Sequence, residues 1–357
     1  MSRLDALLDF MVAQSGSDLH LIAGDPPRMR RYGDLARMGD EIVSREAAEE
    51  SLYGILTPRI REVFENWDNA DFTYARDDQT RFRVNMFRHL GGIGAVFRYV
   101  PAAAYTLEEL EMPSIVHNLC MQRRGMILVT GKTGSGKSTT LAAMVNAINE
   151  RVRGHILTIE DPIEFLHTRK KCLISQREVG EHTAGFAEAL KSALREDPDI
   201  ILVGEMRDLV TVSLAVTAAE TGILILGTLH TNSAAATIDR IINTFPLDKQ
   251  SHVRTMLSTS LRGVIAQQLL KRESGEGMVA AVEIMVNTPA VANTIREGKL
   301  DQLENAIQGG ALVGMQSMDN ALRGLLDRNA ISGEAAYAAA QIKAPFEKYV
   351  GANGGAS

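Results

Sequence analysis

The stretch GKTGSGKST at residues 131–139 constrains the fold of this chain more than any other. It follows the apolar run MILV and precedes LAAMVNAINE, whose residues favour a helix. A strand, a glycine-rich loop and a helix in this order form a phosphate-binding loop, because glycines let successive backbone N–H groups turn toward a phosphate at the positive end of the helix. A glycine-rich turn with a chance lysine is the alternative, and it explains neither flank. We therefore predict a nucleoside triphosphate site.

The loop also assigns roles to its side chains. Lys137 is expected to place its ammonium on the β- and γ-phosphates, and the Ser138 hydroxyl is expected to ligate Mg²⁺. ATP and Mg²⁺ are thus the predicted cofactors. The full predicted nucleotide-binding set is Gly131, Thr133, Gly134, Ser135, Gly136, Lys137, Ser138 and Thr139.

Length and composition set broad limits on the class of protein. A chain of 357 residues is long enough for two domains, and its net charge of −6 argues against a general nucleic-acid binder without excluding a local basic channel. No apolar run approaches the roughly 20 residues that span a bilayer. Residues 1–14 space their apolar side chains as an amphipathic helix does, rather than as a signal peptide. Two cysteines, Cys120 and Cys172, show no pairing pattern and fit a reducing cytosol.

Turn signals and composition divide the chain into regions. Residues 1–100 are predicted to form a small α+β domain, with helices within 44–66 and a strand at 81–87. Residues 101–112 are predicted to be a linker, because small residues and flanking prolines break both sheet and helix. Residues 113–350 form the second predicted domain. The tail GANGGAS at 351–357 is expected to be disordered.

Strands and helices alternate in the second predicted domain, which indicates a parallel sheet covered on both faces. From about residue 247 the pattern predicts mostly helix, apart from a strand-like stretch at 278–286. Asp208 is the expected N-cap of one helix, and Gly222 follows the end of that helix. The expected strands are 126–130, 155–160, 199–205 and 223–230, and the expected helices include 139–150, 183–196 and 208–220.

Ligands of such sheets bind beyond the carboxyl ends of the strands, and three of these ends carry ionisable side chains. Glu160, Asp161 and Glu164 form either a solvated acidic turn or a group that coordinates Mg²⁺ or activates the attacking water. Glu205 ends four apolar residues and has the form of a Walker B carboxylate, which holds Mg²⁺ through water. His230 is either a surface or hydrogen-bonded core histidine, or a sensor of the γ-phosphate.

Arg81 and Arg83 lie on one face of the predicted strand at 81–87. They form either an ordinary solvated sheet face or an electropositive edge that contacts phosphate on another subunit. Their spacing alone leaves both readings open.

Four motifs together resemble the type II/IV secretion ATPases. In order and spacing, GKTGSGKST, ILTIEDPIEF, DPDIILVGEMRD and GTLHTNSAAATIDRIINTFP are similar to the Walker A, Asp box, Walker B and His box of that superfamily. The segments SDLHLIAGDPPRMRRYGDL, RFRVNMFR, CLISQREVG and GMQSMDNAL resemble its PilT-type branch, the type IV pilus retraction motors. The resemblance covers roughly residues 4–343.

The resemblance implies an α/β fold, with a RecA-like P-loop ATPase domain preceded by a smaller PAS-like α+β domain. It also implies a ring-shaped homohexamer with ATP bound between subunits. The implied location is the cytoplasm at the inner-membrane base of the pilus machine, where membrane association runs through partners. Those partners are an inner-membrane pilus platform protein and a paralogous retraction ATPase, and no nucleic acid is expected.

The resemblance also implies roles for the candidate residues. Glu164 corresponds to the general base, Glu205 to the Walker B carboxylate and His230 to a member of the phosphate-sensing His box. The arginine pair at positions 81 and 83 matches residues that reach nucleotide at a subunit interface. Glu160, a further candidate metal ligand, or Asp161 is expected to orient Glu164 or the water of the metal.

Two observations bear on which member of the superfamily this chain resembles. Assembly ATPases of the superfamily carry extra N-terminal domains and a tetracysteine zinc motif, and the length and two cysteines of this chain disfavour that branch. Retraction motors carry an AIRNLI-like motif, whereas residues 290–295 read AVANTI, with alanine at the arginine position. An accessory paralogue of the PilU kind is therefore one alternative, and a RecA-like nucleic-acid translocase is another.

Overall fold

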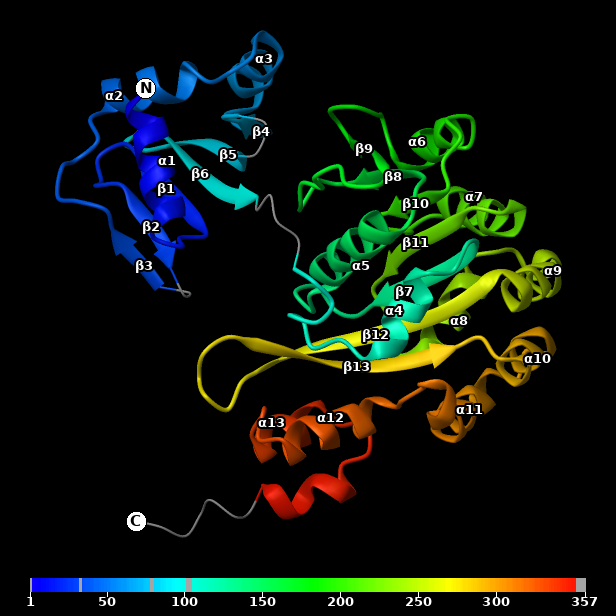
Figure 1. Cartoon of the computed structure of the whole chain (residues 1–357). Helices are drawn as coiled ribbons and strands as arrows, with labels where there is room; N and C mark the ends of the chain where they lie inside the picture. The colour runs from blue at the N-terminus through cyan, green and yellow to red at the C-terminus, as the bar shows by residue number, and fades with distance from the viewer. Residues whose placement is uncertain (1, 32–33, 78–79, 101–104, 351–357) are drawn as a thin grey trace, which may run out of the picture. The chain divides into compact units, whose positions relative to one another are not determined.

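The computed structural model describes residues 2–31, 34–77, 80–100 and 105–350, which belong to two compact units. The first unit covers Met1–Ala103 and the second Ala104–Ser357 (Figure 1). The stretch 351–357, predicted to be disordered, lies outside the described residues. Every described helix is too short or too polar to cross a lipid bilayer.

The first unit is built on an antiparallel sheet with the strand order β3-β2-β1-β6-β5-β4. Its helices are α1 (Arg3–Ala13), α2 (Arg45–Tyr53) and α3 (Pro58–Trp67). Its strands are β1 (Asp18–Ile22), β2 (Arg28–Arg31), β3 (Asp34–Arg37), β4 (Asn69–Ala75), β5 (Arg81–His89) and β6 (Gly92–Val100).

Successive side chains of β5 point to opposite faces of the sheet, and those on one face enter the core of this unit. Phe82, Val84 and Met86 are buried together with the apolar stripe of α1, whereas Arg81 and Arg83 stay partly exposed on the other face. The structure thus confirms the two faces that the alternating sequence predicts.

The second unit is organised by a sheet with the order β13-β12-β7-β11-β10-β8-β9. Neighbouring strands are parallel from β12 to β9, and β13 runs antiparallel to β12 at one edge. The strands are β7 (Gly125–Thr130), β8 (His155–Glu160), β9 (Leu173–Glu178), β10 (Ile200–Val203), β11 (Leu224–Leu229), β12 (Leu261–Lys271) and β13 (Met278–Val286).

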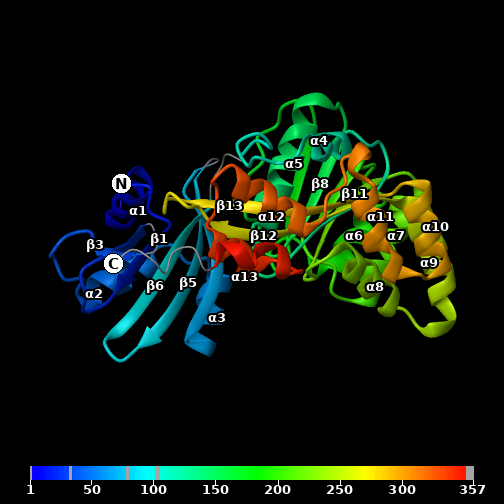
Figure 2. The ribbon, with the colours of Figure 1, turned by 90° about the horizontal axis from the view of Figure 1, so that it is seen from below.

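Helices cover both faces of this sheet, as the alternation of elements predicts. Along β7, Ile127 and Val129 pack with α4 (Ser114–Cys120) and α5 (Lys137–Arg151). Met126 and Leu128 point to the other face, which is covered by α6 (Phe186–Ala193), α7 (Leu209–Thr221), α8 (Ala234–Asn243) and α9 (Leu247–Ser260) (Figure 2). A strand buried on both faces reads as a continuous apolar run, which explains the MILV signal.

The C-terminal helices complete the second unit. Helices α12 and α13 lie next to the β12–β13 edge of the sheet (Figure 1). Their apolar side chains form a core together with Val279 and Ala281 of β13. Their bounds and those of the connecting elements are α10 (Pro289–Glu297), η1 (Leu300–Gln302), α11 (Leu303–Gly309), η2 (Ala311–Val313), α12 (Met318–Asp327), α13 (Gly333–Ala339) and η3 (Ala344–Tyr349).

Two elements differ from the sequence prediction. Strand β12 lies inside the region predicted to be mostly helical, so that prediction is wrong there. This strand lies between β7 and β13 in the sheet, and its central residues are buried. A strand that is buried on both faces of the sheet shows no alternating pattern of apolar and polar residues. Helix α6 begins after Gly185 rather than at Thr183, because Thr183 forms a β-bridge with Val179.

Residues 105–112, predicted as part of the linker, pack onto the second unit. Leu107 is buried in the core that contains α4 and α5. The carboxylate of Glu111 pairs with Arg272 at 2.5 Å and with Arg328 at 2.8 Å. The remaining positions of the predicted linker, 101–104, lie outside the described residues.

Candidate functional site

The carboxyl ends of four parallel strands carry the predicted site residues of the second unit. The glycine-rich loop follows β7, Glu205 follows β10, His230 follows β11, and Glu160 is the last residue of β8. Strand β11 is paired with both β7 and β10. The sheet order therefore places the loop, the Walker B carboxylate and the histidine next to one another.

The glycine-rich loop adopts backbone conformations that favour glycine. Gly131, Gly134 and Gly136 have φ values of +148°, +78° and +85°. Helix α5 begins at Lys137, directly after Gly136, and no side chain of the described residues caps its first turn. Its N-terminal N–H groups are therefore the kind of donors that bind an anion at a helix start.

Lys137 folds back over the loop. Its Nζ donates hydrogen bonds to the carbonyl oxygens of Gly131, at 3.0 Å, and Lys132, at 3.1 Å. Burial lowers the pKa of this ammonium, and the Glu205 carboxylate opposes that shift. The structure thus brings the predicted phosphate-binding lysine and the predicted Walker B glutamate into electrostatic contact.

Glu205 joins two further groups at the sheet edge. One of its carboxylate oxygens lies 3.1 Å from Nε2 of His230 and also pairs with Nε of Arg207. The hydrogen bond with Glu205, the negative charge of that carboxylate and, to a smaller extent, the charge of Asp161 raise the pKa of Arg207. This arginine therefore interacts electrostatically with both the Walker B turn and the Asp-box turn. Arg207 is not among the residues predicted from the sequence, although it lies two positions beyond Glu205 in the Walker B motif DPDIILVGEMRD.

The Asp-box turn is held by a buried carboxylate. Glu160 accepts hydrogen bonds from Thr158 Oγ1 at 2.6 Å, from Gln176 Nε2 at 3.3 Å and from the backbone N–H of Glu164 at 3.5 Å. Glu178 of β9 accepts a further backbone hydrogen bond from the same turn, donated by Ile163. Both oxygens of Glu160 are engaged, so its contacts favour a role in orienting Glu164 over direct metal ligation.

Glu160 predicts a pH dependence of stability. Burial raises the pKa of its carboxyl to about 7 from an ordinary 4.5, against the hydrogen bonds that lower it. The folded chain thus holds this proton more tightly than the unfolded chain. Its contribution to stability is complete below pH 4.5 and is lost as the pH rises toward about 7.

We expect Glu160→Gln to remove this loss, which is on the order of 2 to 3 kcal/mol. The free energy of unfolding of the variant should therefore rise relative to the wild type between about pH 5 and about pH 8. Chemical denaturation of both proteins at the two pH values checks this. A difference between the proteins that stays constant with pH contradicts it.

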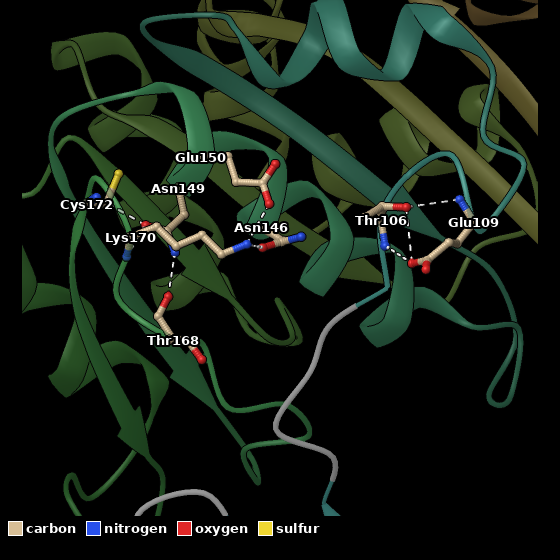
Figure 3. A network of polar contacts seen from close by, with 8 residues as sticks. All are labelled: Thr106, Glu109, Asn146, Asn149, Glu150, Thr168, Lys170 and Cys172. Atoms are coloured by element: carbon tan, nitrogen blue, oxygen red, sulfur yellow. Dashed lines mark hydrogen bonds and ion pairs between the residues drawn. The ribbon is translucent and has the colours of Figure 1, made fainter.

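The far end of α5 is fixed to the segment that follows the Asp box (Figure 3). Asn149 donates to the carbonyl oxygen of Thr168 at 2.7 Å, and its Oδ1 accepts from the backbone N–H groups of Lys170 and Cys172 at 3.2 and 3.1 Å. The Lys170 ammonium pairs with Glu150 at 2.5 Å. The helix that starts at Lys137, the predicted phosphate-binding residue, is thus tied at its other end to the chain leading from Glu164 to β9.

The His box is tied to the strand that precedes the loop. The hydroxyl of Thr237 on α8 lies 2.7 Å from that of Thr231 and 3.4 Å from that of Thr130, the last residue of β7. Helix α8 is capped by Ser233, and the N–H of Ala234 donates to the buried carboxylate of Glu283 at 2.7 Å. These contacts fix the segment carrying His230 to the base of the glycine-rich loop.

Arg81 and Arg83 lie on β5 of the first unit, at its partly exposed face. Arg83 stands opposite Arg98 of β6, and Arg98 pairs with Asp18 at 2.8 Å. This face therefore gathers several guanidinium groups. Contact of the pair with nucleotide on another subunit stays a prediction.

Comparisons with known proteins identify the family of this chain. Residues 68–327 match the family model described as type II/IV secretion system protein. The type IV pilus retraction ATPase PilT of Pseudomonas aeruginosa is 52% identical over 340 residues, which cover 95% of this chain and 98% of that protein. The type IV pilus ATPase PilU of the same organism is 39% identical over 334 residues, 94% of this chain and 87% of that protein.

A solved structure is similar over the same length. The crystal structure of the pilus retraction motor PilT with bound ADP superposes with a TM-score of 0.90 at 41% identity, and covers 98% of this chain and 99% of that one. This chain therefore belongs to the type II/IV secretion system protein family and has its mixed α/β fold. It is an ATP-hydrolysing enzyme, as its motifs predict.

Proposed function

We propose that this chain is the hexameric, Mg²⁺-dependent ATPase motor of type IV pilus retraction, acting in twitching motility. The observation that carries the proposal is the joint placement of Lys137, Glu205 and His230 at one sheet edge, in a chain 52% identical to a retraction ATPase. In this proposal the second unit is the RecA-like ATPase domain. The first unit is the PAS-like domain, and the hinge lies at the boundary between the two units, before the packed residues 105–112.

The proposed reaction is in-line attack of water on the γ-phosphate of ATP. Glu164 positions or deprotonates that water, and its turn is held in place by the buried carboxylate of Glu160. Lys137 stabilises the negative charge that develops on the transferred phosphoryl group. His230 contacts Glu205 and can therefore report the state of the phosphate site to α8.

The donor set at the loop fits a Mg²⁺ ion. Among the described residues, no group of three or more histidine, cysteine or carboxylate side chains could hold a metal ion by itself. Mg²⁺ is usually held by one or two protein ligands together with water and phosphate oxygens, and the Ser138 hydroxyl and the Glu205 carboxylate are such ligands. When bound, the ion would neutralise charge on the phosphates.

The proposed motor needs more than one copy of the chain. Arg81 and Arg83 would reach the nucleotide of another subunit, so that the site is completed in a ring-shaped homohexamer. Closure at the hinge would then couple hydrolysis to rigid-body motion. The proposed place of action is the cytoplasmic face of the inner membrane, at the base of the pilus. There the ring would act on a pilus platform protein, together with a paralogous retraction ATPase.

An accessory role is the second candidate, and α10 is the observation behind it. This helix buries Val291 and Ile295, and Ala292 occupies the position where the family motif has arginine. Arg296, one turn further along α10, donates to Ser258 of α9 at 3.3 Å. The higher identity to PilT than to PilU favours the main motor. A nucleic-acid translocase has no such support, and the net charge of −6 counts against it.

Deletion of the gene in its source organism tests the proposal. The main motor predicts cells that lose twitching motility and accumulate surface pili, because assembled pili are no longer withdrawn. Motility is measured as colony spreading, and piliation by electron microscopy. Unchanged motility contradicts the motor. Restoration of motility by the wild-type gene, and by Ala292→Arg to the same extent, would show that the altered α10 does not limit the motor.

A further inference from the structure

Strand β12 continues alongside the glycine-rich loop. Its residue Ala266 is paired with Thr130, the last residue of β7, so the next residue, Gln267, lies beside the start of the loop. Gln267 is only 2% exposed, and its Nε2 donates a hydrogen bond to the carbonyl oxygen of Ser135 at 2.5 Å. A buried glutamine from a distant strand thus contacts the backbone of the predicted nucleotide site.

Two loop glycines leave room for this glutamine. A Cβ atom on Gly131 would lie 2.4 Å from the backbone carbonyl oxygen of Gln267, closer than real contacts allow. A Cβ atom on Gly136 would lie 3.1 Å from Nε2 of Gln267. The loop therefore packs against both the main chain and the side chain of Gln267, and glycine at these two positions permits the close approach.

The hydrogen bond fixes the orientation of one peptide group. In a trans peptide the C=O of Ser135 and the N–H of Gly136 point in opposite directions. With the carbonyl held toward Gln267, the N–H points away from β12, to the side on which a glycine-rich loop binds phosphate. Rotation of this peptide would turn a carbonyl oxygen toward the phosphates and repel them.

Two buried polar atoms at this contact have no hydrogen-bond partner among the described residues. They are Oε1 of Gln267 and Oγ of Ser135. An unpaired buried polar atom costs stability, so an apolar residue at position 267 would be expected if this position served the sheet alone.

We propose that Gln267 is a positioning residue of the nucleotide site, which holds the Ser135–Gly136 peptide so that its N–H faces the phosphates. The inference rests on the nucleotide site described above. It adds a residue that no motif of the sequence marks.

Gln267→Met tests this role, because methionine keeps the length of the side chain and removes the donor. We expect the Kd for Mg-ADP, measured by calorimetry on the full chain, to rise about tenfold, as expected from the loss of one buried hydrogen bond. The KM for ATP should rise in parallel while kcat changes little, since binding of substrate and transition state is weakened alike. Gln268→Met is the matched control, because neighbouring residues of a strand point to opposite faces.

A second variant covers the event that the methionine variant folds poorly. Gln267→Leu also removes the donor and keeps a side chain of similar volume, so its Kd for Mg-ADP should rise about as much as that of Gln267→Met. Equal Kd values for the position-267 variants and the Gln268→Met control overturn the inference. Wild-type protein that fails to bind Mg-ADP would instead overturn the nucleotide site itself.

Discussion

Replacing Glu164 with glutamine is expected to lower kcat for ATP hydrolysis about 10²- to 10⁴-fold, the usual contribution of a general base. The amide keeps the shape of the side chain but cannot accept a proton from water. The backbone of the turn stays anchored by Glu160, so the Kd for ATP should remain within about threefold of wild type. Phosphate release measures kcat, and calorimetry with a non-hydrolysable ATP analogue measures binding.

A glutamate of the same region provides the control. Glu181 is exposed in the turn between β9 and α6, and Glu181→Gln makes the same chemical change away from the sheet edge. It should hydrolyse ATP as the wild type does. Hydrolysis by Glu164→Gln at a rate close to that of Glu181→Gln would rule out Glu164 as the base.

Replacing Lys137 with alanine is expected to have the second large effect, this time on binding. The variant loses the ammonium that lies over the loop, where charge-assisted hydrogen bonds to phosphate each contribute about 1.5 to 3 kcal/mol. Affinity for ATP should therefore fall about 10- to 100-fold, and turnover should fall to background. Titration with a fluorescent ATP analogue gives the Kd, and thermal unfolding without nucleotide shows that the fold is intact.

Lys191→Ala removes one lysine of the same unit from the exposed surface of α6 and serves as the control. Its affinity for the analogue should equal that of the wild type. If Lys137→Ala also binds the analogue with wild-type affinity, the loop does not bind the triphosphate in the proposed way.

Local motifs predicted much of the site because their signals lie close together in the chain. The loop at 131–139 has its strand and helix on either side, so its place in the fold follows from a short segment. Glu205 and His230 each follow closely after an apolar strand. Parallel strands end at one edge of a sheet, so their proximity to Lys137 could be expected before the structure was known.

Other parts of the site depend on contacts between distant segments, which no local pattern reveals. The central residues of strand β12 are buried on both faces of the sheet, so the strand lacks alternation. Without that strand, Gln267 has no visible link to the loop. The role of Glu160 depends on Gln176, which lies on β9 and reaches it only in the folded sheet. Asn149 likewise gives no sign in the sequence that it holds residues 168–172.

The described contacts make the site of the second unit a connected assembly. Helix α5 links Lys137, the proposed phosphate-binding residue, to the chain that follows Glu164, through Asn149. Helix α8 links the segment with His230 to the end of β7, through Thr237. A change at the phosphates can therefore reach two helices through hydrogen bonds, which is what a motor requires if hydrolysis is to produce movement.

The proposed function is that ATP hydrolysis at this sheet edge drives pilus retraction. Its most direct test is to count retraction events of fluorescently labelled pili in the deletion strain, complemented with either the wild-type gene or Glu164→Gln. We expect retraction with the wild-type gene and long, persistent pili with the variant, at equal protein levels. Retraction by the variant at the frequency of the wild type would contradict it.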